Sequence, residues 1–281
     1  MKKILLPTDF SANSWNAIKY ALNLFKDEEC NFHLLNTYTP LIYNIEYMEV
    51  STAQFGLVDA MKETSKNGLE KLQKRIEEEF RNSKHTFTKI SSFNTLTNEI
   101  KELHEGHAMD FIVMGTKGAT GAKEILLGSN TIHVIKNAKC PVLAIPSDFL
   151  FEIPHEILFP SDYNIDFQIK HVQSILDIAK IYHSKINILN VSFGYDLASN
   201  QVLNKQKLEK YFKKATCVFH SVNHNSVEEA ITKFQLNAPV NLLVMINNKH
   251  SFFENLFFKS TINHIGFHLN IPFLVIPSKT S

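Results

Sequence analysis

The chain has 281 residues, close to twice the usual domain size of about 100 to 150 residues, so we expect two domains. Hydrophobic residues make up 44% of the sequence and charged residues 20%, which excludes a disordered or collagen-like chain. Lys and Arg total 29 against 28 for Asp and Glu, so a formal net charge of +1 gives no reason to expect nucleic-acid binding.

Short apolar runs alternate with longer amphipathic stretches through the first half of the chain. The runs are too short for helices and predict strands, whereas the stretches carry apolar residues at helical spacing. In chain order, the predicted strands are 3–7, 32–37, 86–90, 111–114 and 142–145, and the predicted helices are 12–25, 62–80, 96–104 and 130–138. This alternation predicts an α/β fold, a doubly wound parallel sheet with helices on both faces.

The second half of the chain repeats the first. Residues 4–9, ILLPTD, recur as residues 157–162, ILFPSD, at a shift of 153, whereas the far ends of the two halves align at a shift of 131. The first copy is therefore about 22 residues longer, and we place the surplus around residues 38–61, where Pro40 and several polar residues interrupt any simple period. The repeat predicts two tandem Rossmann-like domains, residues 1–147 and 154–281.

The remaining sequence features predict a cytoplasmic protein without a membrane segment. Asp9 comes too early for the apolar region of a signal peptide, and no later stretch reaches the roughly 20 apolar residues of a membrane span. Cys30, Cys140 and Cys217 lie far apart and form no C-x-x-C pair, which favours free thiols over disulfides or a zinc site.

Four of the nine glycines fall within 14 residues, at positions 115, 118, 121 and 128. They follow the predicted strand 111–114, and Ser129 has the chemistry to open the next helix. A glycine-rich turn between a strand and a helix exposes backbone N–H groups that suit a phosphate. Gly115 and Gly118 would let a ligand approach the backbone closely. A surface loop with a capped helix remains the alternative to a nucleotide site.

The pattern Gly115-x2-Gly118-x9-Gly128-Ser129 resembles the nucleotide-binding pattern of the universal stress proteins, G-x2-G-x9-G-[S/T]. Residues 4–9 and 140–146 resemble the first and last strands of that family, and the resemblance spans both halves as a tandem pair. It implies five-stranded parallel sheets in the order 3-2-1-4-5. It also implies ATP, with or without Mg²⁺, at the carboxyl ends of the first and fourth strands, which is where doubly wound sheets bind ligands.

The resemblance implies a set of nucleotide-binding residues, which are Pro7, Thr8, Asp9, Thr37, Met114, Gly115, Gly118, Gly128, Ser129 and Asn130. The first three would lie near the adenine and ribose, and Thr37 stands where the family usually has a valine beside the adenine. Residues 114–115 would border the sugar, and the last four residues of the set would hold the phosphates. The resemblance further implies that the two halves form a pseudo-dimer through Val142–Ile145 and Phe273–Ile276. A homodimer of the chain is left open.

The second copy departs from the glycine pattern. At a shift of 131 the three glycines become Ile246, Lys249 and Lys259, and only Ser260 is kept. Isoleucine disfavours the backbone conformations that glycine permits, and the new side chains fill space that a phosphate needs. We therefore expect the second domain not to bind nucleotide in the manner of the family.

Three functions stay open on this evidence. The first is a stress-related signalling module that binds ATP or another adenine nucleotide in its first copy, with the second copy as a structural partner. The second is a slow ATPase or phosphoryl transferase, for which Asp9 is the carboxylate nearest the expected site. The third is a scaffold without nucleotide, although clustered glycines in a glycine-poor chain argue against it. We favour binding over catalysis and predict no catalytic or metal-ligating residue.

Overall fold

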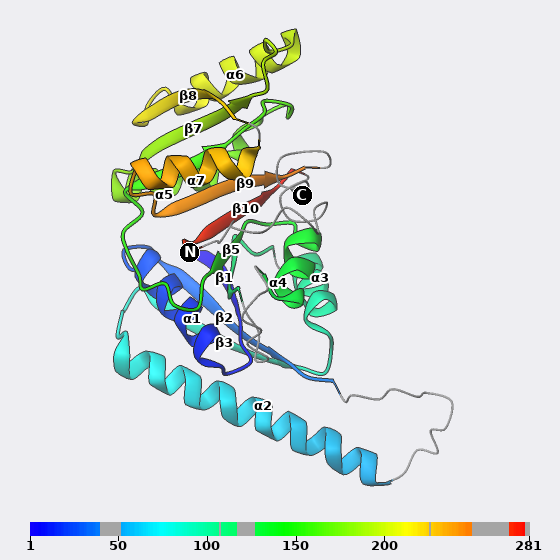
Figure 1. Ribbon diagram of the computed structural model, residues 1–281. Helices are drawn as coiled ribbons and strands as arrows, with labels where there is room; N and C mark the ends of the chain where they lie inside the picture. The colour runs from blue at the N-terminus through cyan, green and yellow to red at the C-terminus, as the bar shows by residue number, and fades with distance from the viewer. Residues whose placement is uncertain (40–51, 107, 117–126, 225, 249–269, 279–281) are drawn as a thin grey trace, which may run out of the picture. The chain divides into compact units, whose positions relative to one another are not determined.

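The computed structural model describes residues 1–39, 52–106, 108–116, 127–224, 226–248 and 270–278 (Figure 1). The chain divides into two compact units, Met1–Ala138 and Lys139–Ser281. In both units helices connect parallel strands, so the predicted α/β class is confirmed. The side chains of residues 52–55 are not among those described.

The first unit alternates strands and helices. Its elements are β1 (Lys2–Pro7), α1 (Ala12–Leu24), β2 (Cys30–Thr37), α2 (Thr52–Glu79), β3 (His85–Ser92), α3 (Leu96–Gly106), β4 (Phe111–Gly115) and α4 (Ser129–Asn137). Their ends lie within two residues of the predicted ones, except that α2 begins at residue 52 instead of 62. Most side chains in residues 56–64 are exposed, so this part of α2 has no buried face that would give the sequence a helical period.

The strands of the first unit are parallel and run in the order β3-β2-β1-β4. Ile4, Leu5 and Leu6 are fully buried, as expected for a central strand that helices cover on both faces. Right-handed crossovers place α1 and α2 on one face of these strands and α3 on the other. Figure 1 shows α3 beside α4, with which it is in contact.

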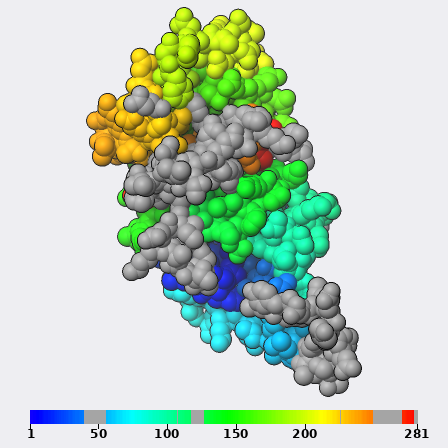
Figure 2. Space-filling view, turned by 45° about the vertical axis from the view of Figure 1, so that its right-hand side comes forward, coloured from blue at the N-terminus to red at the C-terminus, as the bar shows by residue number. Residues whose placement is uncertain are grey.

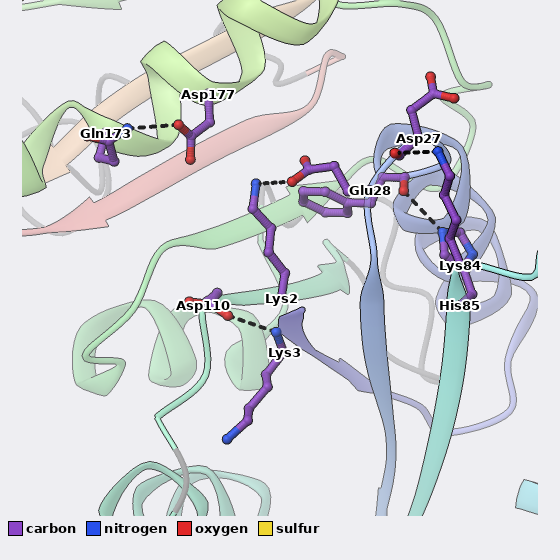
Figure 3. Close-up of polar contacts among 10 residues, drawn as sticks. Lys2, Lys3, Asp27, Glu28, Lys84, His85, Asp110, Gln173 and Asp177 are labelled. Carbon is purple, nitrogen blue, oxygen red and sulfur yellow. Dashed lines mark hydrogen bonds and ion pairs between the residues drawn. The ribbon is translucent and has the colours of Figure 1, made fainter.

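Polar contacts fix the amino end of β1 (Figure 3). Lys2 Nζ forms an ion pair with Glu28 Oε2 at 2.6 Å, and the backbone N–H of Lys3 donates to Asp110 Oδ2 at 2.7 Å. Asp110 directly precedes β4, so the second contact joins the starts of two neighbouring strands. These two contacts therefore stabilise the amino-terminal edge of the sheet. The predicted site residues lie at the opposite edge.

The second unit contains a mixed sheet. Its elements are β5 (Val142–Ile145), β6 (Glu156–Pro160), the 3-10 turn η2 (Ile169–His171), α5 (Gln173–Tyr182), β7 (Lys185–Ser192), α6 (Ser199–Phe212), β8 (Cys217–Asn223), α7 (Val227–Asn237), β9 (Leu242–Asn247) and β10 (Phe273–Pro277). The strand order is β8-β7-β6-β9-β10-β5. The first five strands are parallel and reproduce the predicted order 3-2-1-4-5.

Strand β5 differs from a purely parallel arrangement. It pairs antiparallel with β10, with Leu143 opposite Leu274 and Val142 opposite Val275. Its contacts assign it to the second unit, although it follows the last helix of the first sequence copy. The boundary between sequence copies at residues 147–154 stays a prediction.

Two smaller expectations concern the cysteines and membrane segments. Cys30 and Cys140 are buried free thiols, and Cys217 is a half-buried free thiol. Among the helices that the structure describes, none combines the length and the apolar character needed to cross a membrane.

Candidate functional site

The described part of the predicted site lies at the carboxyl ends of β1, β2 and β4. Strands β1 and β4 are parallel neighbours with Leu5 opposite Ile112, so residues 7–9, which end β1 and begin the next loop, lie beside residues 114–116. Thr37 ends the next strand, β2, at the same edge. Connections from β1 and β4 leave toward opposite faces of the sheet, and this is the point where a doubly wound sheet has room for a ligand.

Side chains fix the sharp loop between β1 and α1. Thr8 Oγ1 accepts a hydrogen bond from the backbone N–H of Phe10 at 3.0 Å, and Asp9 Oδ1 accepts one from the N–H of Ser11 at 3.0 Å. Asn36 Nδ2 donates to the carbonyl of Thr8 at 2.7 Å, which ties the loop to β2. Phe10 has a φ of 62°, a left-handed conformation that non-glycine residues seldom adopt. Three hydrogen bonds thus fix the conformation of the loop, and Asp9 is exposed at the surface.

The second unit repeats this loop bond for bond. Ser161 Oγ accepts from the N–H of Tyr163 at 3.1 Å, and Asp162 Oδ1 accepts from the N–H of Asn164 at 3.0 Å. Asn190 Nδ2 donates to the carbonyl of Ser161 at 2.9 Å, and Tyr163 has a φ of 55°. The sequence repeat is thus also a repeat of backbone geometry. Because both copies have the loop, it does not by itself distinguish a nucleotide site.

Gly115 packs against helix α1. A Cβ added at Gly115 would lie 2.7 Å from Cγ and 2.8 Å from Oδ1 of Asn13, closer than real Cβ atoms approach other atoms. The end of the Asn13 side chain therefore lies where a side chain at position 115 would begin. At the aligned position of the second unit, Ile246 is a buried strand residue near the end of β9.

Hydrogen bonds connect the two ends of the glycine-rich segment. The N–H of Gly128 donates to the carbonyl of Thr116 at 2.6 Å, and Thr131 Oγ1 donates to the carbonyl of Gly115 at 2.9 Å. The Thr131 side chain is buried, so its bond holds the first turn of α4 against the end of β4. The amide of Gly128 already has a protein acceptor and is not open to a phosphate.

The start of α4 retains other backbone donors. Gly128, rather than Ser129, is the N-cap, and no side chain caps the helix. Ser129 and Asn130 belong to the first turn, whose N–H groups have no partner within a helix. No acceptor for these two amides is found among the residues that the structure describes. Together with the positive end of the helix dipole, they provide a site for an anion.

Several predicted residues lie outside the described ranges. These are Gly118 in the first copy and Lys249, Lys259 and Ser260 in the second. Conversely, Asn36 and Thr131 form hydrogen bonds that hold the described part of the site together, and Asn13 lies against Gly115. None of these three residues was identified from the sequence. The sequence repeat could have identified Asn36, because Asn190 occupies the equivalent position of the second copy. Asn13 and Thr131 act only through contacts between distant segments.

Comparison with known proteins shows the family of the chain. The profile of the universal stress protein family matches residues 1–146. Universal stress protein MJ0531 of Methanocaldococcus jannaschii is 36% identical over 152 residues, which covers 51% of this chain and 81% of that protein. Universal stress protein MJ0577 of the same organism is 33% identical over 156 residues, which covers 51% of this chain and 94% of the relative.

A solved structure shares the fold over the whole length. The universal stress protein from Archaeoglobus fulgidus aligns with 98% of this chain and 98% of its own, with a TM-score of 0.71. The sequence identity is 19%, so this likeness concerns the fold alone.

Proposed function

The chain belongs to the universal stress protein family, and on this premise we propose that it is a stress-related regulatory protein that binds ATP in its first sequence copy. The observation that carries the proposal is the position of the complete glycine pattern. The pattern begins at the end of β4 and finishes at the start of α4, beside the loop that follows β1. The family profile matches this copy, whereas the second copy has lost all three glycines.

In this proposal the nucleotide lies across the carboxyl ends of β1 and β4. The residues proposed for the adenine and ribose are Pro7, Thr8, Asp9, Thr37, Met114 and Gly115, and those for the phosphates are Gly118, Gly128, Ser129 and Asn130. The exposed Asp9 carboxylate suits a ribose hydroxyl, since a carboxylate only accepts hydrogen bonds. The first-turn amides of α4 suit the phosphates, with or without Mg²⁺.

Gly128 acts differently from the other phosphate residues. Because its N–H donates to Thr116, its contribution is the absence of a side chain at the helix start. A large side chain at this N-cap position would occupy the space directly before the amides of Ser129 and Asn130.

We favour binding over hydrolysis. Asp9 is the carboxylate nearest the proposed site, and one of its oxygens already accepts the N–H of Ser11. Its position in the β1 loop associates it with the sugar end of the nucleotide, so no general base is assigned beside the terminal phosphate.

We also propose that the sequence copies 1–147 and 154–281 form an intramolecular pseudo-dimer through Val142–Ile145 and Phe273–Ile276. The antiparallel pairing of β5 with β10 supports this proposal. These are the last strands of the two copies, and antiparallel pairing of equivalent strands is what a twofold relation requires. The second copy then serves as a structural partner that has no nucleotide of its own.

Calorimetric titration of the full chain with ATP and Mg²⁺ tests the binding site. We expect one nucleotide per chain, loss of the heat in Gly128→Trp, and unchanged heat in the matched variant Lys259→Trp at the aligned position of the second copy. Circular dichroism should show that both variants remain folded. Absence of binding at millimolar ATP, or loss of binding in Lys259→Trp alone, would contradict the proposal.

A further inference from the structure

A groove of about 560 Å³ lies in the second unit between α7 and the strands β7 and β8. The strands contribute Asn187, Leu189, His220 and Val222, and α7 contributes Lys233 and Phe234. Figure 2 shows α7, in orange, at the surface of this unit. The volume falls within the range of small-molecule sites, about 300 to 1,000 Å³. No residue of the proposed nucleotide site lines this groove.

The walls of the groove suit a flat apolar body. Leu189 and Ala230 are buried, and Val222 and Phe234 are half-buried, so apolar side chains from both the sheet and the helix face the groove. The rings of His220 and Phe234 meet edge to face, with centroids 5.0 Å apart. These two rings hold each other in place, which reduces the ordering cost of binding a ligand between the helix and the sheet.

A chain of hydrogen bonds forms the polar floor. Asn187 is only 1% exposed, and its Nδ2 donates to Glu156 Oε2 at 2.6 Å. Its Oδ1 must then accept, so His220 Nε2, at 3.0 Å, carries a proton and donates. In the neutral ring, Nδ1 is left as an acceptor. Burial is the main cause that lowers the pKa of His220, and Lys185 lowers it further, whereas Glu156 acts in the opposite direction. The neutral ring is therefore favoured near pH 7.

The charge of the groove is positive. Lys185 and Lys233 line it, and no Asp or Glu is among its lining residues. Lys185 Nζ lies 3.8 Å from Glu156 Oε1, so its charge is largely offset. Within the described part of the chain, Lys233 forms no ion pair. The net attraction of the groove for an anion therefore comes from Lys233, which lies on α7.

The polar floor is specific to the second copy. The register of the strands makes Glu156 equivalent to Lys3 and Asn187 equivalent to His33, because Lys3 pairs with Asn31 as Glu156 pairs with Lys185. The chain from glutamate through asparagine to histidine is thus absent from these positions of the first unit. The shared fold therefore does not require this chain of hydrogen bonds. Its presence in the second copy alone, at these positions, points to a role specific to that copy.

We propose that the groove between α7 and the strands β7 and β8 binds a small organic anion with a flat, aromatic-sized apolar body. The body lies against Val222, Ala230 and Phe234, and the acidic group faces Lys233. The charge of Lys233 and the apolar side chains of the walls together favour this class over neutral aromatic molecules and over small inorganic anions.

Calorimetric titration of the full chain with 2-naphthalenesulfonate, and with neutral 2-naphthol for comparison, tests the proposal. We expect saturable binding of one sulfonate per chain, about threefold tighter than 2-naphthol, because the exposed Lys233 forms an ion pair worth about 0.2 to 1 kcal/mol. Lys233→Glu should remove that advantage. Lys101→Glu makes the same change on α3, the corresponding helix of the first unit, and should leave both affinities unchanged.

A second variant tests the location independently of charge. Ala238 lines the groove and has an extended backbone, with φ −142° and ψ 138°, which a tryptophan adopts without strain. Ala238→Trp should abolish the binding of both probes while the circular dichroism spectrum stays unchanged. The proposal fails if the parent chain shows no saturable binding of the sulfonate. It also fails if Lys101→Glu weakens the binding of the sulfonate as much as Lys233→Glu does. The same holds if Lys233→Glu leaves the affinity for the sulfonate unchanged.

Discussion

Gly115 of β4 lies against Asn13 of α1 at the carboxyl edge of the first unit. A Cβ at position 115 would overlap the end of the Asn13 side chain, which would then have to turn away. The sequence showed that Gly115 belongs to a glycine cluster, but it did not show what the glycine contacts. Its neighbour comes from a helix that starts 103 residues earlier in the chain, and only the folded structure brings the two together.

We predict that Gly115→Ala lowers the free energy of unfolding by about 1 kcal/mol, the lower end of the usual cost of extra volume, because the end of the half-buried Asn13 side chain can turn away. Asn13→Ala should remove the overlap, so the double variant should lose less stability than the sum of the single variants. Urea unfolding of the four proteins measures this coupling. Strictly additive losses would mean that Asn13 does not restrict position 115.

His171 makes stability depend on pH in the second unit. It is 4% exposed, its Nδ1 accepts the N–H of Gln168 at 3.2 Å, and its Nε2 therefore donates to the carbonyl of Ser278 at 2.9 Å. Burial is the main cause that lowers its pKa, and Lys170 lowers it further, while the bond to Ser278 and the charge of Asp166 oppose this shift. The folded state thus holds the ring neutral at pH values where the unfolded chain begins to protonate it.

We predict that the free energy of unfolding falls as the pH drops below about 6.5, because the unfolded chain then binds more protons than the folded one. For one proton the slope cannot exceed about 1.4 kcal/mol per pH unit. The contribution is complete above the unfolded pKa and is lost as the pH falls toward the lowered pKa of the folded state. Urea unfolding of the parent and of His171→Gln between pH 5 and 8 checks this, and equal slopes would contradict the assignment.

At the scale of elements, the short buried strands and the amphipathic helices were predictable because burial leaves a period in the sequence. β5 was predicted at its observed bounds, and α1 to within one residue. The start of α2 was missed, and most of the side chains in residues 56–64 are exposed, so this part of the helix leaves no helical period in the sequence. The N-cap of α4 was also missed. Gly128 is the N-cap residue and forms a backbone hydrogen bond to Thr116, and no local sequence pattern predicts this bond.

Thr131 allows a test of how α4 is held against β4. Thr131→Val keeps the shape of the side chain and removes the hydroxyl that donates to the carbonyl of Gly115. We expect a loss of about 1 to 3 kcal/mol in unfolding free energy, because the buried carbonyl loses its side-chain donor. Under the proposed function, ATP should also bind more weakly, since the start of α4 is then less firmly placed.

Thr131→Ser is the matched control, because it retains the donor. It should keep most of the stability and most of the affinity for ATP in urea unfolding and in calorimetry. If both variants lose stability equally, the methyl group rather than the hydrogen bond holds α4 in place.

At the scale of the whole molecule, the two sequence copies share the loop after their first strand but differ at the glycine positions. The loops after β1 and β6 keep the same hydrogen bonds, so both copies retain the turn at the carboxyl edge. The glycine positions diverged, and the second unit carries the buried Ile246 where the first has Gly115. The difference at the glycine positions could be read from the sequence, because it consists of the residue types themselves. It did not predict the groove under α7, which depends on side chains from three separate elements.

The pairing of β5 with β10 predicts how the first copy behaves alone. Leu143 and Ile145 are fully buried in the whole chain, and the ladder to β10 satisfies backbone groups on one side of β5. A fragment of residues 1–147 lacks β10, so it has an open strand edge with apolar side chains, which favours pairing with another copy. We predict that this fragment forms dimers in sedimentation velocity runs. A parent fragment that stays folded and monomeric at high concentration would show that β5 does not need a partner strand, and it would remove the main support for the pseudo-dimer.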